Sequence, residues 1–322
     1  VVALDLEPPT EAYRRSLGDM QDPGSEGGRV EFATADVLDR DAVLGICRGR
    51  IRPPVRIVHG AAITPTTEAE RSMPQRIVNV NLMGTVSMLE VARQLEARRF
   101  VYMSSTAVYA PAPESAGPIS EGSKVMGEGG EDGSPPGLYT ICKLAGELVV
   151  KRYGALFGLS AVSGRMSSIY GPLEQPRATR VRPSVIYSLV RACLTGAPVR
   201  ARGRAFTRCY THAADAALVW RHLTLSNDLK HDLYNVSAGA AYSLDWVLET
   251  IQSLEPEFRY SYVGPKQAAD IEVTAAGERG RLDISKTRAE FGYTPQYDLR
   301  QGLQSYLAWA RKNPWFFEGE DS

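Results

Sequence analysis

Two side chains with a spacing suited to acid–base chemistry lie near the middle of the chain, where Tyr139 and Lys143 form a Tyr-x-x-x-Lys pair. Residues four apart on a helix share one face, so the Lys143 ammonium can lower the pKa of the Tyr139 phenol from its ordinary value of about 10. An apolar, strand-like run before the pair ends in the hydroxyl residues Ser104, Ser105 and Thr106. A phenol, an ammonium and a hydroxyl together predict proton transfer coupled to hydride transfer at an alcohol carbon.

The segments around the pair alternate between short apolar runs and longer helical patterns, which predicts an α/β fold with a doubly wound parallel sheet. Strands are predicted at 1–4, 30–33, 55–59, 100–103 and 161–165. Helices are predicted from residue 82 to about 97, at 139–157, 183–195, 213–225, 243–253 and 285–291, and at 299–311. The Pro-, Gly- and Ser-rich residues 111–137 predict a surface loop that could act as a lid.

Composition excludes several classes of protein. The 322 residues include 37 basic and 37 acidic side chains, so no net field draws the chain to nucleic acid or to an anionic membrane. No apolar run approaches the roughly 18 residues of a membrane span, and the N-terminus lacks a targeting pattern, so a cytoplasmic location is expected. The four cysteines form no C-x-x-C motif, and we expect reduced thiols and no metal site.

Asp5 closes the first predicted strand, where a dinucleotide-binding fold places the acidic residue that bonds the adenosine ribose. A polar strand end is the alternative interpretation. The glycine-rich phosphate loop of such a fold should lie about 20 residues before this acid, and only four residues precede Asp5 here. We expect a fragment that lacks its first strand, phosphate loop and helix; a natural short form that binds the dinucleotide poorly is the alternative.

A larger set of motifs follows one order along the chain: Asp5, Asp36-Val37, His59-Gly60-Ala61-Ala62, Asn81-Leu82-Met83-Gly84-Thr85, Ser104-Ser105-Thr106-Ala107-Val108-Tyr109, Tyr139-x-x-x-Lys143 and Tyr170-Gly171-Pro172. This set resembles the extended short-chain dehydrogenase/reductase family, and more narrowly its NAD-dependent nucleotide-sugar epimerases and dehydratases. Later landmarks at 208–215 and 282–286 extend the resemblance to nearly the whole chain.

The resemblance implies a Rossmann domain for NAD at residues 1–171, to which 208–237 return, truncated at its N-terminus. A smaller C-terminal α/β substrate domain would comprise 172–207 and 238–322. The resemblance also implies a homodimer, formed through the helix near residue 89 and the tyrosine helix.

Cofactor-binding roles follow from the resemblance position by position. Asp5 would bond the adenosine ribose, and Asp36 with Val37 would border the adenine. Small residues would let the cofactor pass closely at Gly60, Ala61 and Ala62. Asn81 would help to hold a relay to the lysine, and Ser104 would also border the cofactor.

The resemblance also implies the catalytic and substrate roles. Tyr139 would be the acid and base, Ser105 would orient the reacting oxygen, and Lys143 would bond the nicotinamide ribose. The substrate would contact Thr106, Ser168 and Arg208, the last of these through its phosphates. Arg279 and Arg281 are weaker candidates for phosphate contacts.

Within the family the resemblance favours chemistry at one carbon. The 4,6-dehydratases carry Asp-Glu directly after the catalytic hydroxyl residue, whereas Thr106-Ala107 stands here. We therefore expect a nucleotide-sugar 4-epimerase that acts through a keto-sugar. A one-way dehydrogenase of a sugar or other secondary alcohol is the first alternative, and a non-catalytic NAD-sensing or scaffold protein is the second.

Overall fold

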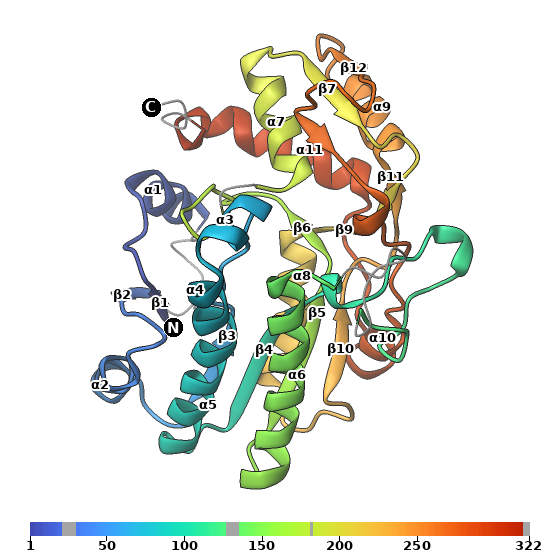
Figure 1. The fold of residues 1–322 in the computed structure, drawn as a ribbon. Coiled ribbons are helices and arrows are strands. Elements are labelled where there is room, and N and C mark those ends of the chain that lie inside the picture. The colour runs from blue at the N-terminus through green and yellow to red at the C-terminus, as the bar shows by residue number, and fades with distance from the viewer. Residues whose placement is uncertain (21–29, 127–134, 181–182, 318–322) are drawn as a thin grey trace.

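Four parallel strands form the central sheet of this computed structural model, which describes residues 1–20, 30–126, 135–180 and 183–317 (Figure 1). Their order across the sheet is β10 (Leu233–Val236), β5 (Ala161–Met166), β4 (Arg99–Ser105) and β3 (Arg56–His59). β10 comes from far along the sequence and pairs with β5 in register from Leu233 opposite Ser163. The predicted fold class, a doubly wound parallel α/β sheet, is confirmed.

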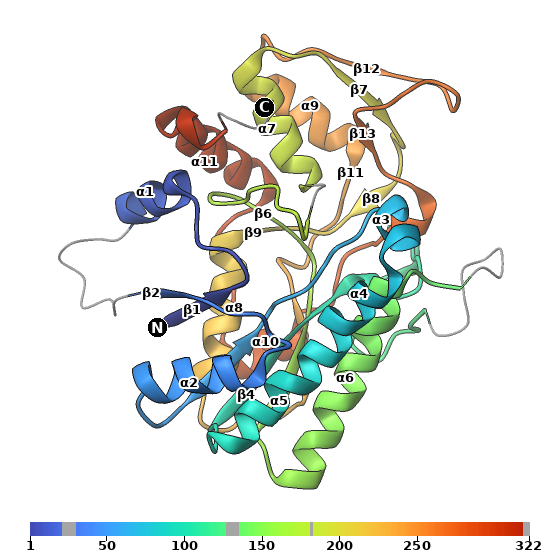
Figure 2. The same ribbon diagram turned by 60° about the vertical axis from the view of Figure 1, so that its left-hand side comes forward.

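Strand β4 shows why helices cover both faces of this sheet. Phe100 and Tyr102 pack in a core with α5 (Gly84–Gln94) and α6 (Leu138–Phe157), whereas Val101 packs in a second core with α8 (Ala213–Leu225). Successive side chains of a strand point to opposite faces, so a strand that is apolar throughout needs cover on both. In Figures 1 and 2, α5 and α6 lie side by side on one face.

Helix α6 brings the Tyr-x-x-x-Lys pair to the sheet. It begins after Gly137 and ends at Gly158, whose φ of 66° is the left-handed conformation that glycine adopts at helix C-termini. Before it, a π-helical segment at Asn79–Met83 separates α4 (Pro74–Val78) from α5. The sequence predicted an α-helix that begins at residue 82. The π-helical turn was missed because the spacing of hydrophobic residues does not reveal one inserted residue.

Strands β1 (Val2–Asp5) and β2 (Glu31–Thr34) form a separate parallel pair. Helix α1 (Glu11–Met20) follows β1, and α2 (Arg40–Arg50) follows β2 and packs on α5. Within the strands that the structure describes, β1 shares no ladder with β3, the nearest strand of the central sheet along the chain. Strands β1 to β5 and β10 are therefore divided into a pair and a group of four.

The C-terminal unit lies over the carboxyl ends of these strands (Figure 2). Its parallel sheet has the order β12 (Tyr260–Tyr262), β7 (Val199–Arg202) and β13 (Ile271–Glu272), and its core lies among α7 (Val185–Thr195), α9 (Leu244–Leu254) and α11 (Leu299–Lys312). Two further pairs are β6 (Ser168–Tyr170) with β9 (Tyr210–His212) and β8 (Thr207–Arg208) with β11 (Tyr242–Ser243). The remaining elements are α3 (Thr67–Ser72), α10 (Ser285–Phe291) and the short helical turns Thr106–Val108, Glu114–Ala116, Ala275–Gly277 and Pro314–Phe316.

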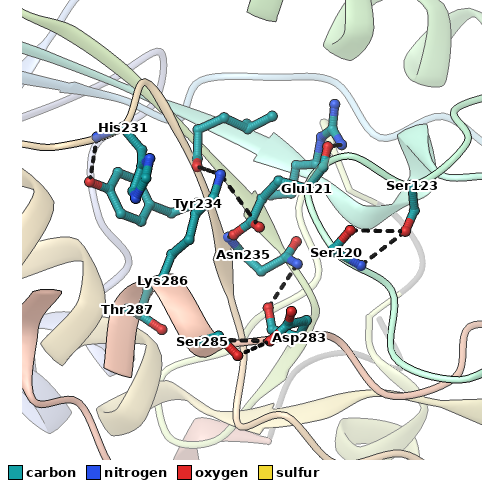
Figure 3. A network of polar contacts seen from close by, with 12 residues as sticks. Ser120, Glu121, Ser123, His231, Tyr234, Asn235, Asp283, Ser285, Lys286 and Thr287 are labelled. Carbon is teal, nitrogen blue, oxygen red and sulfur yellow. Dashed lines mark hydrogen bonds and ion pairs between the residues drawn. The ribbon is translucent and has the colours of Figure 1, made fainter. Parts of the chain in front are cut away.

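The segment that follows β4 is anchored to the edge of the sheet rather than lying free on the surface. The Asn235 backbone N–H donates to the Glu121 carboxylate at 2.8 Å. The Asn235 side-chain amide donates to Ile119 O and Asp283 O at 3.0 Å, and Figure 3 shows it directed toward Asp283. Lys286 of α10 adds an ion pair to Glu121 at 3.5 Å. Residues 127–134 of the predicted lid lie outside the described residues.

Most predicted helices and strands match the structure within a few residues, including β3, α7, α8, α9, α10 and α11. The short strands of the C-terminal unit were not predicted. The division at 1–171, 172–207 and 238–322 stays a prediction.

Candidate functional site

A cavity of about 1350 Å³ lies at the carboxyl ends of the parallel strands, the edge at which open α/β sheets bind ligands. It is lined by Asp5, Asp36, Val37, Gly60, Ala61, Ala62, Ser104, Ser105, Thr106, Tyr139, Lys143, Ser168 and Arg208. Arg279, a weaker candidate, also lines it, whereas Asn81 and Arg281 do not. Residues from distant parts of the sequence therefore converge on one space.

The catalytic candidates come from two neighbouring elements, β4 and α6. Ser105 ends β4, and its hydroxyl accepts the Ala107 N–H at 3.1 Å, which begins the short turn after the strand. Tyr139 and Lys143 lie on the first two turns of α6, with Lys143 Nζ 5.7 Å from the Tyr139 ring centroid. Lys143 Nζ donates to Met103 O of β4 at 2.7 Å, which fixes the ammonium against the strand end.

Burial dominates the acidity of Tyr139. It raises the pKa of the phenol, while the Ser105 hydroxyl, the positive charge of Arg180 and the Thr64 hydroxyl each lower it. The sequence predicted Lys143 as the cation that lowers this pKa. In the structure Lys143 is not among the groups that lower it; the positive charge comes from Arg180, and Thr64 adds a hydroxyl, from a turn and a loop that the motif does not include.

Lys143 is itself only 4% exposed. Burial lowers the pKa of its ammonium to about 8, while the neighbouring Cys142 and Glu147 raise it. A buried ammonium that can lose a proton near neutral pH can exchange protons with a nearby phenol and with ribose hydroxyls. Burial raises the pKa of the Cys142 thiol, in keeping with a packing role.

Behind the hydroxyl residues, a buried ion pair holds the end of β4. Ser104 donates to Glu147 of α6 at 2.5 Å, and the Glu147 carboxylate binds Arg165 of β5 through Nε at 2.9 Å and Nη2 at 2.7 Å. Ser104 therefore lines the cavity with its hydroxyl committed to Glu147. Glu147 lies one helical turn after Lys143 on α6, and its bonds reach Ser104 of β4 and Arg165 of β5. The ion pair of Glu147 and Arg165 therefore fixes α6 and β4, the two elements that carry the catalytic candidates.

The ends of β1 and β2 carry the carboxylates expected for the adenosine half of a dinucleotide. Asp5 is exposed, and within the described residues its carboxylate accepts one long bond, from Glu7 N at 3.4 Å, which leaves it able to bond ribose hydroxyls. Asp36 accepts the Leu38 N–H at 2.9 Å and so shapes the turn beside Val37. The residues present fit a ribose and an adenine, although no glycine-rich loop is among the described lining residues.

The loop after β3 is fixed by Asn81. Its amide accepts the Ile63 N–H at 2.7 Å and donates to Ile63 O at 2.8 Å, so Asn81 holds the backbone that lines the cavity instead of reaching Lys143. At Gly60 an added Cβ would lie 2.7 Å from Met103 Sδ, so packing against β4 also requires a small residue there.

The C-terminal unit contributes two arginines. Arg208 Nε is buried with no hydrogen-bond partner within the described residues, which suits it to a bound anion. Arg279 is 7% exposed and donates to the carbonyl oxygens of Thr106 and Tyr109 at 3.2 and 2.7 Å, so it holds the turn after Ser105. Arg281 pairs with Glu114 at 3.5 Å and does not line the cavity.

Several lining residues were missed by sequence reasoning: Thr64, Gln75, Arg76, Gln175, Arg177, Thr179 and Arg180. The last four belong to the segment after Tyr170-Gly171-Pro172, where arginines recur. Taken alone, such a segment is typical of a solvated turn. Within the described residues, no three His, Cys, Asp or Glu side chains are placed to hold a metal ion. No helix in the described part of the chain is long and apolar enough to cross a membrane.

Known proteins resemble the chain over most of its length. It is 27% identical over 300 residues to UDP-glucose 4-epimerase of Mycolicibacterium smegmatis (88% of this chain, 83% of the relative). It is 28% identical over 291 residues to dTDP-glucose 4,6-dehydratase of Actinoplanes sp. (88% and 81%). Among solved structures, MoeE5 in complex with UDP-glucose and NAD shares the fold with a TM-score of 0.71 at 22% identity (97% of this chain, 91% of that chain).

A family model matches residues 6–237, well over half of the chain. This match begins directly after β1 and includes β2 to β5 and β10, the Tyr-x-x-x-Lys helix and the Tyr170-Gly171-Pro172 turn beside the cavity. The protein is therefore an enzyme that uses NAD and belongs to the NAD-dependent epimerase/dehydratase family.

Proposed function

We propose that the protein is a nucleotide-sugar 4-epimerase that works through a keto-sugar. The observation that carries the proposal is the convergence of Tyr139, Ser105 and Lys143 on one cavity. NAD, when bound, supplies a hydride acceptor and donor. Tyr139 takes the proton from the reacting hydroxyl, Ser105 hydrogen-bonds and orients the same oxygen, and Lys143 keeps a positive charge beside the phenol.

The charges around Ser105 favour this proposal over a dehydratase. Loss of water needs a second acid and base beside the sugar. The acidic residues that line the described cavity are Asp5 and Asp36, at the ends of β1 and β2, and Glu272, which pairs with Arg202 at 2.9 Å. None of them follows Ser105, where Thr106 and Ala107 stand.

The test compares two phenol deletions on the same helix. Tyr139→Phe should lower turnover of UDP-glucose to UDP-galactose by at least about 100-fold with an unchanged melting temperature. Tyr153→Phe removes a hydroxyl that donates to Glu90 of α5 and does not line the cavity, and it should leave turnover unchanged. Retained activity in the Tyr139 variant would refute the assignment.

Cofactor balance separates an epimerase from a one-way dehydrogenase. An epimerase returns the hydride, so product should form without a stoichiometric rise in absorbance at the NADH band. A rise equal to the product formed would assign a dehydrogenase. The absence of both turnover and NAD binding would favour a non-catalytic protein.

We also propose a homodimer formed through α5 and α6. Helix α6 exposes Ile141, Leu148, Leu156 and Phe157, the last three by 65, 53 and 51%, and the π-helical turn that leads into α5 exposes Met83. Exposed apolar groups gathered on neighbouring helices are typical of an interface. Leu148→Lys should halve the mass measured by light scattering, whereas Leu225→Lys on α8 should not; equal masses for both variants would contradict the proposed face.

A further inference from the structure

The cavity holds more basic residues than the roles described above use. Six basic residues line it: Arg76, Lys143, Arg177, Arg180, Arg208 and Arg279. The donors of Arg279 are engaged by carbonyl oxygens, and Arg208 is the cation that the family resemblance gives to the phosphates. Arg76, Arg177 and Arg180 remain without a ligand-binding role, and the last two come together from the turn after β6.

This turn is built to a fixed shape. Arg177 N–H donates to Arg180 O at 3.1 Å, and Arg180 N–H donates to Arg177 O at 2.8 Å. Thr179 O accepts the Thr64 N–H at 2.8 Å, which docks the turn on the loop after β3. The same Thr64 bears a hydroxyl that acts on the Tyr139 phenol, so the turn lies beside the reacting end of the cavity.

One acidic residue anchors the turn and offsets one of its two positive charges. Glu174 accepts the Ser184 N–H at 2.6 Å and the Ser184 hydroxyl at 2.7 Å, and it pairs with Arg180 through one nitrogen at 3.2 Å. Its side chain is 11% exposed, whereas that of Arg180 is 43% exposed. Within the described residues, the Arg177 side chain makes no hydrogen bond or ion pair.

We propose that Arg177 and Arg180 form an anion subsite beside Tyr139, and that the sugar of the preferred substrate carries a carboxylate there. In a hexuronic acid the C6 carboxylate is borne by C5, the neighbour of the carbon that a 4-epimerase oxidises. A guanidinium binds a carboxylate through two parallel hydrogen bonds, which a neutral hydroxymethyl group cannot replace. The same two charges also offset the repulsion between the carboxylate and the Tyr139 phenolate that accepts the proton.

This inference rests on the proposed function, and ligand binding tests it separately from turnover. Calorimetry measures the Kd of UDP-glucuronic acid, UDP-glucose and UDP for the wild type and for Arg177→Gln, Arg180→Gln, Arg180→Lys and Arg208→Gln. Arg200→Gln is the matched control, because this arginine pairs with Asp270 on the surface and does not line the cavity. Melting temperatures show that each variant is folded.

The wild type should bind UDP-glucuronic acid at least tenfold more tightly than UDP-glucose. Arg177→Gln and Arg180→Gln should each raise the Kd of UDP-glucuronic acid by about 10- to 100-fold. The Kd of UDP-glucose and that of UDP should rise by less than about threefold. Arg180→Lys should recover part of the loss, and Arg208→Gln should weaken all three ligands.

Equal losses for all three ligands in the Arg177 and Arg180 variants would place these residues on the diphosphate and overturn the proposal. Binding of UDP-glucose without a preference for the acid would overturn it too, while leaving the proposed function intact. Failure of the wild type to bind any of the three would overturn both.

Discussion

The buried pair of Glu147 and Arg165 offers the sharpest test of how the site is held together. Their side chains are 8 and 5% exposed, and Glu147 also accepts the Ser104 hydroxyl. Glu147→Ala removes the carboxylate and leaves the Arg165 guanidinium buried without its counter-charge. The backbone oxygen of Glu121, at 3.1 Å from Arg165 Nη1, and the Tyr109 ring, whose centroid is 4.6 Å from Arg165 Cζ, remain as neutral partners of this group.

The expected loss follows from these contacts. Breaking a buried ion pair from one side costs about 3–5 kcal/mol, because the remaining charge keeps its desolvation penalty. A protein of this kind has a free energy of unfolding of about 5–15 kcal/mol, so the loss is a large part of the total. Arg165→Met leaves Glu147 uncompensated and should cost a similar amount. The double variant Glu147→Ala/Arg165→Met leaves no unpaired charge and should lose no more than either single variant.

Urea unfolding followed by circular dichroism gives the four free energies of this cycle. Lys151→Ala, on the same helix, is the control: it removes an ion pair with Asp232 whose partners are 70 and 50% exposed, and it should cost less than about 1 kcal/mol. A loss below about 1 kcal/mol for Glu147→Ala, or strictly additive losses in the double variant, would refute the reasoning.

Three further predictions concern pH and packing. Burial lowers the pKa of His59 to about 3, so below about pH 6.5 the unfolded chain binds a proton that the folded protein does not, and the free energy of unfolding falls. His59→Gln should therefore shift the midpoint of acid unfolding to lower pH. An unchanged midpoint would contradict this role of His59. Burial lowers the pKa of Lys143 to about 8, so between pH 8 and 10.5 the unfolded chain holds a proton that the folded protein has lost. The free energy of unfolding of the wild type should therefore rise by up to about 3 kcal/mol relative to Lys143→Met across this range. Urea midpoints of the two proteins that stay parallel from about pH 8 to 10.5 would contradict this. A Cβ at Gly302 would collide with the Tyr170 hydroxyl, whereas one at the helical Gly45 meets nothing within 4 Å. In thermal melts, Gly302→Ala should therefore lower the free energy of unfolding by at least about 1 kcal/mol, and Gly45→Ala should raise it by about 0.5–1 kcal/mol. Equal effects of the two variants would contradict this packing.

The sequence predicted those parts of the molecule that depend on local patterns. The run Phe100-Val101-Tyr102-Met103 is apolar on both faces, which predicts a strand covered on both sides, and Gly158 marks the end of the tyrosine helix. The ordered motifs also predicted which strand ends would meet, because carboxyl ends of parallel strands share one edge.

Features that depend on tertiary contacts could not be predicted in this way. Strands such as β8 and β13 have two residues, too few for a period to be visible, and exist because a neighbouring strand completes them. Arg177 and Arg180 gain significance only when the Thr64 contact brings their turn to Tyr139. Likewise, nothing local shows that Glu147 would be buried against Arg165, since a Glu on a helix is usually solvated.

The division of the parallel strands into a pair and a group of four has a consequence for motion. The pair β1 and β2 has four residues in each strand, and an isolated ribbon of that size has little stability of its own. It is retained by side chains such as Leu4 and Val37, which pack on the core around α5 rather than through a ladder to β3. Amide protons of β1 and β2 should therefore exchange with solvent much faster than those of β4 and β5, and by opening together as one small cooperative unit. Asp5 and Asp36 lie on this unit. The affinity for the adenosine end of the cofactor therefore includes the free energy of keeping β1 and β2 paired and packed on the core around α5.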